Sequence, residues 1–241
     1  MNLVKDKWMS ADFLEFRLYL DSLAEAGYRD FTLKLIPNLA TCRGIRAPVI
    51  QSIAKSIQQG HVDSFLTITP TSYEEKLVVA KVIGSVTSFD KLKKYINSFI
   101  PYIDNWAVCD SFAAGVRQFA KNLDLGFAYV MSLLSSSFPY SKRLGTVLLL
   151  IYYSKEPYMD AMIEVIPTIR DEDYYVKMGV AWLVSTLYIV NPKKTWVLLD
   201  GRLDSFIHSK SISKICDSYQ VSDQDKIIAK SARKQKNQYK N

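Results

Sequence analysis

The sequence predicts an all-α protein whose helical pairs stack with a right-handed rotation into a curved α-solenoid with a concave groove. Apolar residues recur at helical spacing along most of the 241 residues. Proline and glycine interrupt them at short intervals, and no period-2 strand pair with turn chemistry occurs. A degenerate repeat with the length of a helical pair also runs through the chain.

Nine segments carry the apolar spacing of helices, and short connections separate them. Breaks occur at Gly44, Pro48, Pro101 and Pro192, among others. Because helices joined by short loops pack as antiparallel neighbours, these segments predict stacked pairs. The expected helices span residues 12–26, 49–59, 73–86, 92–99, 106–120, 142–153, 174–190, 192–200 and 212–219.

The repeat is visible where a basic residue opens a small and apolar helical stretch. Lys76, Arg143 and Lys177 occupy this place; the last two lie 34 residues apart, and Lys76 lies about twice that distance upstream of Arg143. Helical-pair repeats of this length stack with equivalent positions on one face. We therefore expect Arg143 and Lys177 to point into one groove, where basic side chains can bind a phosphate backbone.

Composition excludes several classes of protein. The three cysteines are odd in number and widely separated, and only His61 and His208 accompany them, so we expect neither a disulfide framework nor a metal site. No apolar stretch approaches the roughly 20 residues of a membrane span. The N-terminus lacks the apolar core of a signal peptide. These features predict a cytoplasmic monomer without metal, cofactor or membrane contact.

The net charge of +7 is concentrated at the C-terminus. Six lysine and arginine residues and no acid lie in residues 226–241, which leaves about +1 for the rest of the chain. We expect a single repeat domain over residues 1–225, followed by a basic tail that is a fraying helix end or a disordered arm. Any phosphate-binding face on the domain must then come from local clustering of cations.

Trp106 and Asp110 lie one helical turn apart inside a largely apolar run. Residues i and i+4 share a helix face, so the two side chains are expected side by side. An aromatic ring beside a carboxylate can hold a cationic group, because both attract positive charge. The alternative is that Trp106 belongs to the core and Asp110 caps or pairs locally.

In several motifs the chain resembles the AlkD-type DNA alkylation-repair proteins, which are built from HEAT-like helical repeats. The resemblance covers roughly residues 28–220. The motifs that carry it are Gly44-Ile45-Arg46-Ala47-Pro48, Asn105-Trp106-Ala107-Val108-Cys109-Asp110-Ser111-Phe112, Lys142-Arg143, Tyr174-Tyr175-Val176-Lys177-Met178-Gly179-Val180-Ala181-Trp182 and Asn191-Pro192.

The resemblance implies an enzyme that removes cationic N3- and N7-alkylated purines from duplex DNA without turning the base into a deep pocket. By this resemblance Trp106, Asp110 and Trp182 line the lesion site, and Arg143 holds an adjacent phosphate. Asp110 would stabilise the oxocarbenium character of the deoxyribose or position a water, while the tryptophans bracket sugar and base. The alternative for Trp182 is a core position.

One segment departs from the family pattern. Active members carry a helix near the N-terminus that enters the minor groove beside the lesion, and residues 28–38 correspond to it. This segment is short, has Leu35 where active enzymes place a groove-contacting tyrosine, and ends at Pro37. It predicts a divergent branch that lacks the groove-probing helix and binds DNA more weakly.

Further phosphate contacts are expected at two places. Arg43, Arg46 and Lys55 surround a turn that feeds a helix N-terminus, where backbone N–H groups can also bind phosphate; the alternative is a solvated turn. Lys210 lies in Ser209-Lys210-Ser211, which we expect to cap the helix at 212–219 while touching phosphate.

Three functional hypotheses remain open at this stage. The first is a glycosylase for cationic alkylpurines in duplex DNA. The second is a non-catalytic paralogue that binds DNA weakly through the same groove. The third is a helical-repeat scaffold for a protein partner, with no DNA affinity beyond that of the basic tail.

Overall fold

A computed structural model describes the backbone of residues 1–238 and the side chains of residues 1–232. Within these residues the chain forms fourteen α-helices and no strand, so the all-α prediction is confirmed. The chain divides into two compact units, Met1–Lys121 and Asn122–Asn241. No helix among the described residues has both the length and the apolar character needed to cross a membrane.

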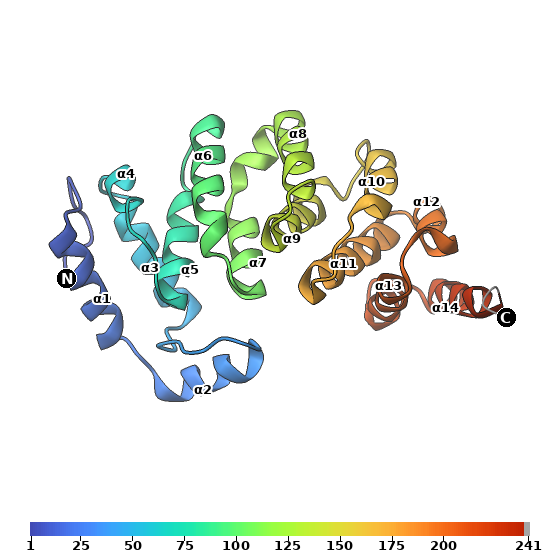
Figure 1. Cartoon of the computed structure of the whole chain (residues 1–241), viewed down its shortest axis with the longest axis horizontal. Helices are drawn as coiled ribbons and strands as arrows, with labels where there is room; N and C mark the ends of the chain where they lie inside the picture. The colour runs from blue at the N-terminus through green and yellow to red at the C-terminus, as the bar shows by residue number, and fades with distance from the viewer. Residues whose placement is uncertain (239–241) are drawn as a thin grey trace. The chain divides into compact units, whose positions relative to one another are not determined.

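In the first unit, α5 packs between α3 and α7, and the three helices form a row (Figure 1). Their inward faces are apolar and fully buried, as at Ile50, Val78 and Phe112. This unit contains α1 (Ser10–Ser22), α2 (Ala26–Leu35), α3 (Ala47–Ile57), α4 (Val62–Phe65), α5 (Tyr73–Ile83), α6 (Phe89–Phe99) and α7 (Trp106–Gly115).

The second unit has a row of the same kind, in which α11 packs against both α9 and α13. The apolar residues Leu144, Val180, Val184 and Ile212 are fully buried. The unit contains α8 (Leu123–Leu134), α9 (Pro139–Leu148), α10 (Met159–Val165), α11 (Tyr174–Val190), α12 (Pro192–Val197), α13 (Ser205–Asp217) and α14 (Asp223–Gln238).

Helix α14 crosses the expected start of the basic tail. It packs against α13, with Ala229 and Ala232 buried and the hydroxyl of Tyr188 donating to the Asp225 carbonyl. Residues 226–232 are therefore part of a packed helix. The rest of the predicted tail lies outside the described side chains, and residues 239–241 lie outside the described backbone.

Helix α2 occupies the segment that the sequence predicted to be short and to end at Pro37. Its ten residues run from Ala26 to Leu35 and end before Pro37, at the boundary that the proline predicted. Only Thr32 of the helix is buried, whereas Phe31 and Leu35 are 56% and 52% exposed. The helix therefore contributes little to the core of the unit and presents an apolar surface to solvent.

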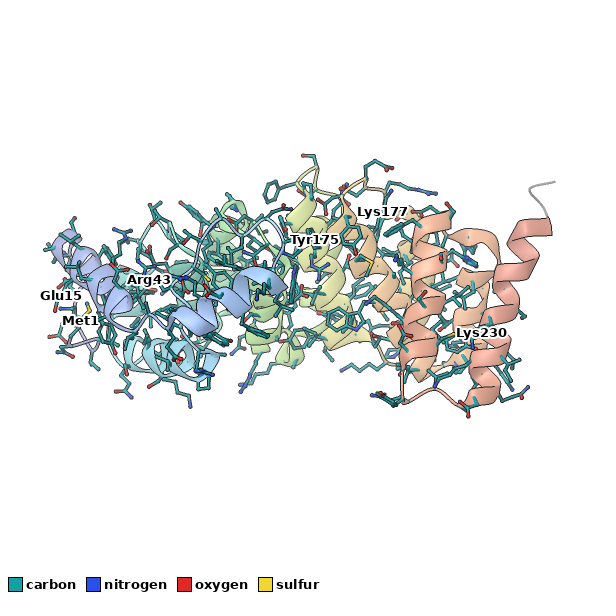
Figure 2. All side chains as sticks on the ribbon, turned by 90° about the horizontal axis from the view of Figure 1, so that it is seen from below. Met1, Glu15, Arg43, Tyr175, Lys177 and Lys230 are labelled. Carbon is teal, nitrogen blue, oxygen red and sulfur yellow. The ribbon has the colours of Figure 1, made fainter. Side chains whose placement is uncertain are left out.

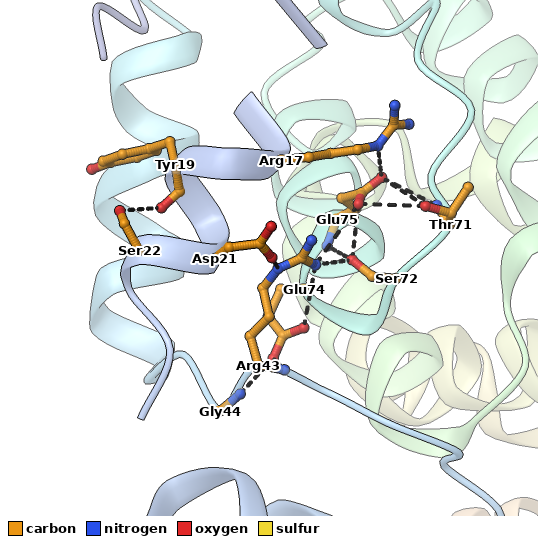
Figure 3. A network of polar contacts seen from close by, with 10 residues as sticks. All are labelled: Arg17, Tyr19, Asp21, Ser22, Arg43, Gly44, Thr71, Ser72, Glu74 and Glu75. Carbon is orange, nitrogen blue, oxygen red and sulfur yellow. Dashed lines mark hydrogen bonds and ion pairs between the residues drawn. The ribbon is translucent and has the colours of Figure 1, made fainter. Parts of the chain in front are cut away.

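The turn at Arg43 and Gly44 attaches α2 to the row of helices. Both backbone N–H groups donate to Oε1 of the buried Glu74, at 2.7 and 2.9 Å (Figure 3). Gly44 has a φ of +79°, and a Cβ there would lie 2.3 Å from the backbone nitrogen of Arg29 in α2. Only glycine allows this approach, so Glu74 on α5 and Gly44 together set the position of α2.

We expect Gly44→Ala to destabilise the first unit by about 3 kcal/mol, because it combines a left-handed backbone with backbone overlap. Gly27→Ala is the matched control: it lies in α2 itself, with open space around its Cβ position. It should stabilise by up to about 1 kcal/mol through helix propensity. Urea unfolding at constant m-value measures both, and equal midpoints for the two variants would contradict this account of the turn.

Candidate functional site

Asn105 caps the N-terminus of helix α7. The side-chain oxygen of Asn105 accepts from the Val108 N–H at 3.0 Å, and its amide donates to Asp104 at 2.9 Å. Asp104 in turn pairs with Lys76 of α5 at 2.5 Å. Asn105 itself is buried. These bonds fix the first turn of α7, and with it the ring of Trp106, to the neighbouring helix.

Trp106 and Asp110 lie on the partly exposed face of α7, one turn apart. The other face of the helix is buried, including Val108, Cys109 and Phe112. The helical spacing that the sequence predicted for the pair is confirmed, and Trp106 is not a core residue. The catalytic role of the pair stays a prediction.

Arg143 is enclosed in the second unit and only 5% exposed. Its guanidinium donates to the backbone carbonyl of Tyr175 in the first turn of α11. The same group lies against Gly179, where a Cβ would be 3.5 Å from Nη1. Arg143 thus ties α9 to α11.

Lys177 occupies the repeat-equivalent place on α11 but a different environment. Its ammonium pairs with Glu172 at 2.7 Å, and this hydrogen bond raises the pKa of Lys177. Figure 2 shows Lys177 close to Tyr175 of the same helix. Further along α11, Trp182 is 38% exposed while the adjacent Leu183 and Val184 are buried. The core alternative for Trp182 is therefore wrong.

Arg43 and Arg46 differ in what their charges contact. The Arg43 guanidinium pairs with Asp21 at 2.6 Å and donates to the Ser72 hydroxyl, close to Glu74 and Glu75 (Figure 3). It is a structural arginine of this network, and we drop it from the expected phosphate contacts.

Arg46 is at the N-cap of α3, where it pairs with Glu25 at 2.9 Å and stacks 5.0 Å from the Tyr28 ring centre. Its side chain is more than half exposed. Arg46 therefore links α2 to the start of α3 while keeping access to solvent, which leaves a phosphate contact open to it.

The family described as DNA alkylation repair enzyme matches residues 17–211, which include α3 to α11 and parts of both units. The chain belongs to this family. No curated protein matches the chain. Family membership gives this DNA alkylation repair protein a general role in the repair of alkylated DNA, and it implies an interaction with DNA.

In this family member the expected cap at Ser209 and Ser211 is wrong. Helix α13 starts at Ser205, and Asp204 is its N-cap, with the side chain accepting from the Ile207 N–H at 2.9 Å. Ser211 is buried inside the helix and donates to the Ile207 carbonyl. The two serines lie within the helix because Asp204 already caps its N-terminus and Ser205 is its first residue.

The other expected contact of the α13 segment, Lys210, lies 5.7 Å from the ring centre of Phe206, and Tyr174 of α11 packs against the same ring. The ring of Phe206 thus contacts both Lys210 and Tyr174. A phosphate contact for Lys210 stays a prediction.

The expected site residues of the repair protein lie in both units. Apart from Arg43, they lie on the packed rows: Arg46 at α3, Trp106 and Asp110 on α7, Arg143 on α9, Lys177 and Trp182 on α11, and Lys210 on α13. The described residues contain no group of three or more His, Cys, Asp and Glu side chains that could hold a metal ion.

Sequence reasoning missed the exposed face of α2, although the i, i+4 spacing of Phe31 and Leu35 could have indicated it.

We expect Asn105→Ala to lower the stability of the first unit by about 1–2 kcal/mol, since the α7 cap and a buried polar group lose their bonds. Asn105→Ser retains a capping oxygen and should recover most of this loss. Thermal unfolding measures the stability. Equal losses in the two variants would contradict the cap.

Proposed function

We propose that this repair protein is a monomeric DNA glycosylase that excises cationic N3- and N7-alkylpurines from duplex DNA. The observation that carries the proposal is the pairing of Trp106 with Asp110 on the partly exposed face of a capped helix. A flat aromatic ring and a carboxylate at that spacing match a planar cation and the positive charge that develops on its sugar.

The chemistry needs little besides charge stabilisation. An alkylated purine is already cationic, so the bond between it and the sugar carbon breaks with the electron pair leaving on the base. Asp110 stabilises the oxocarbenium that forms and orients a water, which adds to the sugar carbon and releases a proton. The products are the neutral methylated base and an abasic site. Trp182 is assigned to the opposite side of the sugar and base.

Helix α2 supports an active enzyme over the non-catalytic alternative. The sequence-based argument against activity rested on a short segment that ends at Pro37 and has Leu35 in place of a tyrosine; α2 keeps these features but forms a ten-residue helix with an exposed apolar face. Its exposed Phe31 and Leu35 are suited to insertion into a minor groove, where apolar side chains wedge between base steps. Arg46, which stacks on Tyr28 of α2, is placed in this proposal against the adjacent phosphate.

The remaining cations are assigned to contacts with the DNA backbone. Lys177 lies in the first turn of α11, and Lys210 lies beside Phe206 of the first turn of α13. Both are proposed as phosphate contacts. Arg143 is proposed as a phosphate contact on the family resemblance; its guanidinium is buried and also donates to the Tyr175 carbonyl.

We expect Asp110→Asn to slow base release from duplex DNA containing N7-methylguanine by about 100-fold or more, because the variant keeps the shape and loses the charge. Binding to an undamaged duplex of the same sequence should stay within a few-fold. Asp90→Asn is the matched control, since it removes one exposed carboxylate from α6 of the same unit. Single-turnover release of the methylated base measures the chemical step.

The other hypotheses predict different results in the same assay. Salt-dependent duplex binding without base release by the unaltered chain identifies the non-catalytic paralogue and contradicts the glycosylase. No duplex binding beyond that of the basic C-terminus identifies a protein scaffold. The C-terminal contribution is removed by replacing all six lysine and arginine residues of 226–241 with glutamine rather than by deletion, because deletion would remove the buried Ala229 and Ala232.

A further inference from the structure

A cavity of about 530 Å³ lies at the C-terminal ends of α3, α5 and α7, wholly within the first unit. Each of the three helix ends supplies a cation to its lining: Lys55 from α3, Lys81 from α5 and Arg117 from the turn after α7. The neutral polar side chains of Gln51, Gln58 and Ser85 complete the polar part of the wall. No carboxylate belongs to this lining.

The wall of this cavity has a fixed backbone. Gly84 follows α5 and Gly115 ends α7, and a Cβ at Gly84 would lie 2.6 Å from the Gly115 carbonyl oxygen. Any larger residue at position 84 would push the two helix ends apart. The close approach holds the cations of neighbouring helices around one space.

The three cations differ from most others in the unit because their charge is not neutralised. Within the described part of the chain, Lys55, Lys81 and Arg117 form no ion pair, whereas Arg17, Arg43 and Lys76 each pair with a carboxylate. Burial lowers the pKa of Lys81, and no carboxylate opposes that effect. An anion in the cavity would neutralise the positive charge of these side chains and favour the charged form of Lys81.

The ordinary role of cations at helix C-termini does not account for the cluster. There they satisfy the last carbonyl groups, but the end of α5 is already satisfied by the protein itself. The Gln58 amide donates to the Lys81 carbonyl at 2.9 Å, and the Ser85 and Val86 N–H groups donate to the carbonyls of Val82 and Ile83. The charge of the three side chains is therefore available to a ligand.

We propose that this cavity binds the backbone phosphates of duplex DNA, an inference that rests on the DNA-binding part of the proposed function. Three converging cations without an acid suit a phosphodiester, and the amide and hydroxyl groups can donate to its oxygens. Gly115 is the last residue of α7, so the cavity lies about 14 Å along that helix from Trp106 and about 8 Å from Asp110. About two to four base-pair steps span these lengths.

The test compares duplex binding at several salt concentrations. Lys81→Gln combined with Arg117→Gln should reduce the slope of log affinity against log salt by about one for each phosphate that the protein no longer neutralises. Lys7→Gln combined with Lys94→Gln removes the same charge from exposed positions outside the cavity and should leave the slope unchanged. Lys81→Arg combined with Arg117→Lys keeps the charge and should keep the slope.

Lys55→Gln gives an independent readout if the double variant unfolds, because Lys55 is exposed and its replacement disturbs no packing. It should reduce the slope as well. Base release at saturating DNA should be the same in all these variants, because no reacting group lies in the cavity. The effect therefore falls on affinity and not on the chemical step.

An unchanged slope in both the double variant and Lys55→Gln would overturn the inference. Titration with inorganic phosphate separates a free anion from a DNA backbone: if the double variant loses phosphate binding but keeps the duplex slope, the site takes a free anion and the inference fails. If the unaltered chain releases no base but the slope changes as expected, the glycosylase proposal fails and the phosphate site stands.

Discussion

The side-by-side packing of alternate helices is the constraint on which the other features depend. In each unit a middle helix, α5 or α11, is covered on both sides by neighbours of the same row, so its residues must be small or apolar there. One face of a helix in such a row is buried in the core, so polar residues occupy the other faces. This explains why Trp106 and Asp110 share the partly exposed face of α7, and why Trp182 is exposed on an otherwise apolar α11.

The same packing makes α2 dependent on one buried carboxylate. Glu74 is a residue of the middle helix, and burying its carboxylate is costly unless hydrogen bonds compensate; its Oε1 accepts two such bonds and its Oε2 accepts none from the described residues. Its partners are two backbone N–H groups of the turn after α2, which places the turn against the row (Figure 3). The helix itself buries almost nothing, so its position is set by its attachment and not by its own packing.

Much of the fold could be predicted from the sequence because helix faces leave a periodic signal. The helix at 174–190 was predicted to the residue, and Pro37 correctly marked the end of α2. The predicted helix at 106–120 stops at Gly115, where glycine breaks the pattern. Arg43 was misread because its partners Asp21 and Glu74 are far away in sequence. Lys81 and Arg117 were missed for the same reason, since only the packed row brings them together.

The distribution of charge explains how a nearly neutral body can still bind a polyanion. Outside the basic C-terminus the chain carries about one net positive charge, which is too little for a general attraction to DNA. Three cations of the first unit that form no ion pair within the described residues nevertheless line one cavity, while Asp21, Glu75 and Asp104 neutralise arginines and a lysine elsewhere in the unit. Carboxylates that stabilise the fold thereby leave the cavity at the ends of α3, α5 and α7 as a local positive site. Phosphate contacts are then expected where cations line a surface without carboxylates, and no overall excess of lysine is needed.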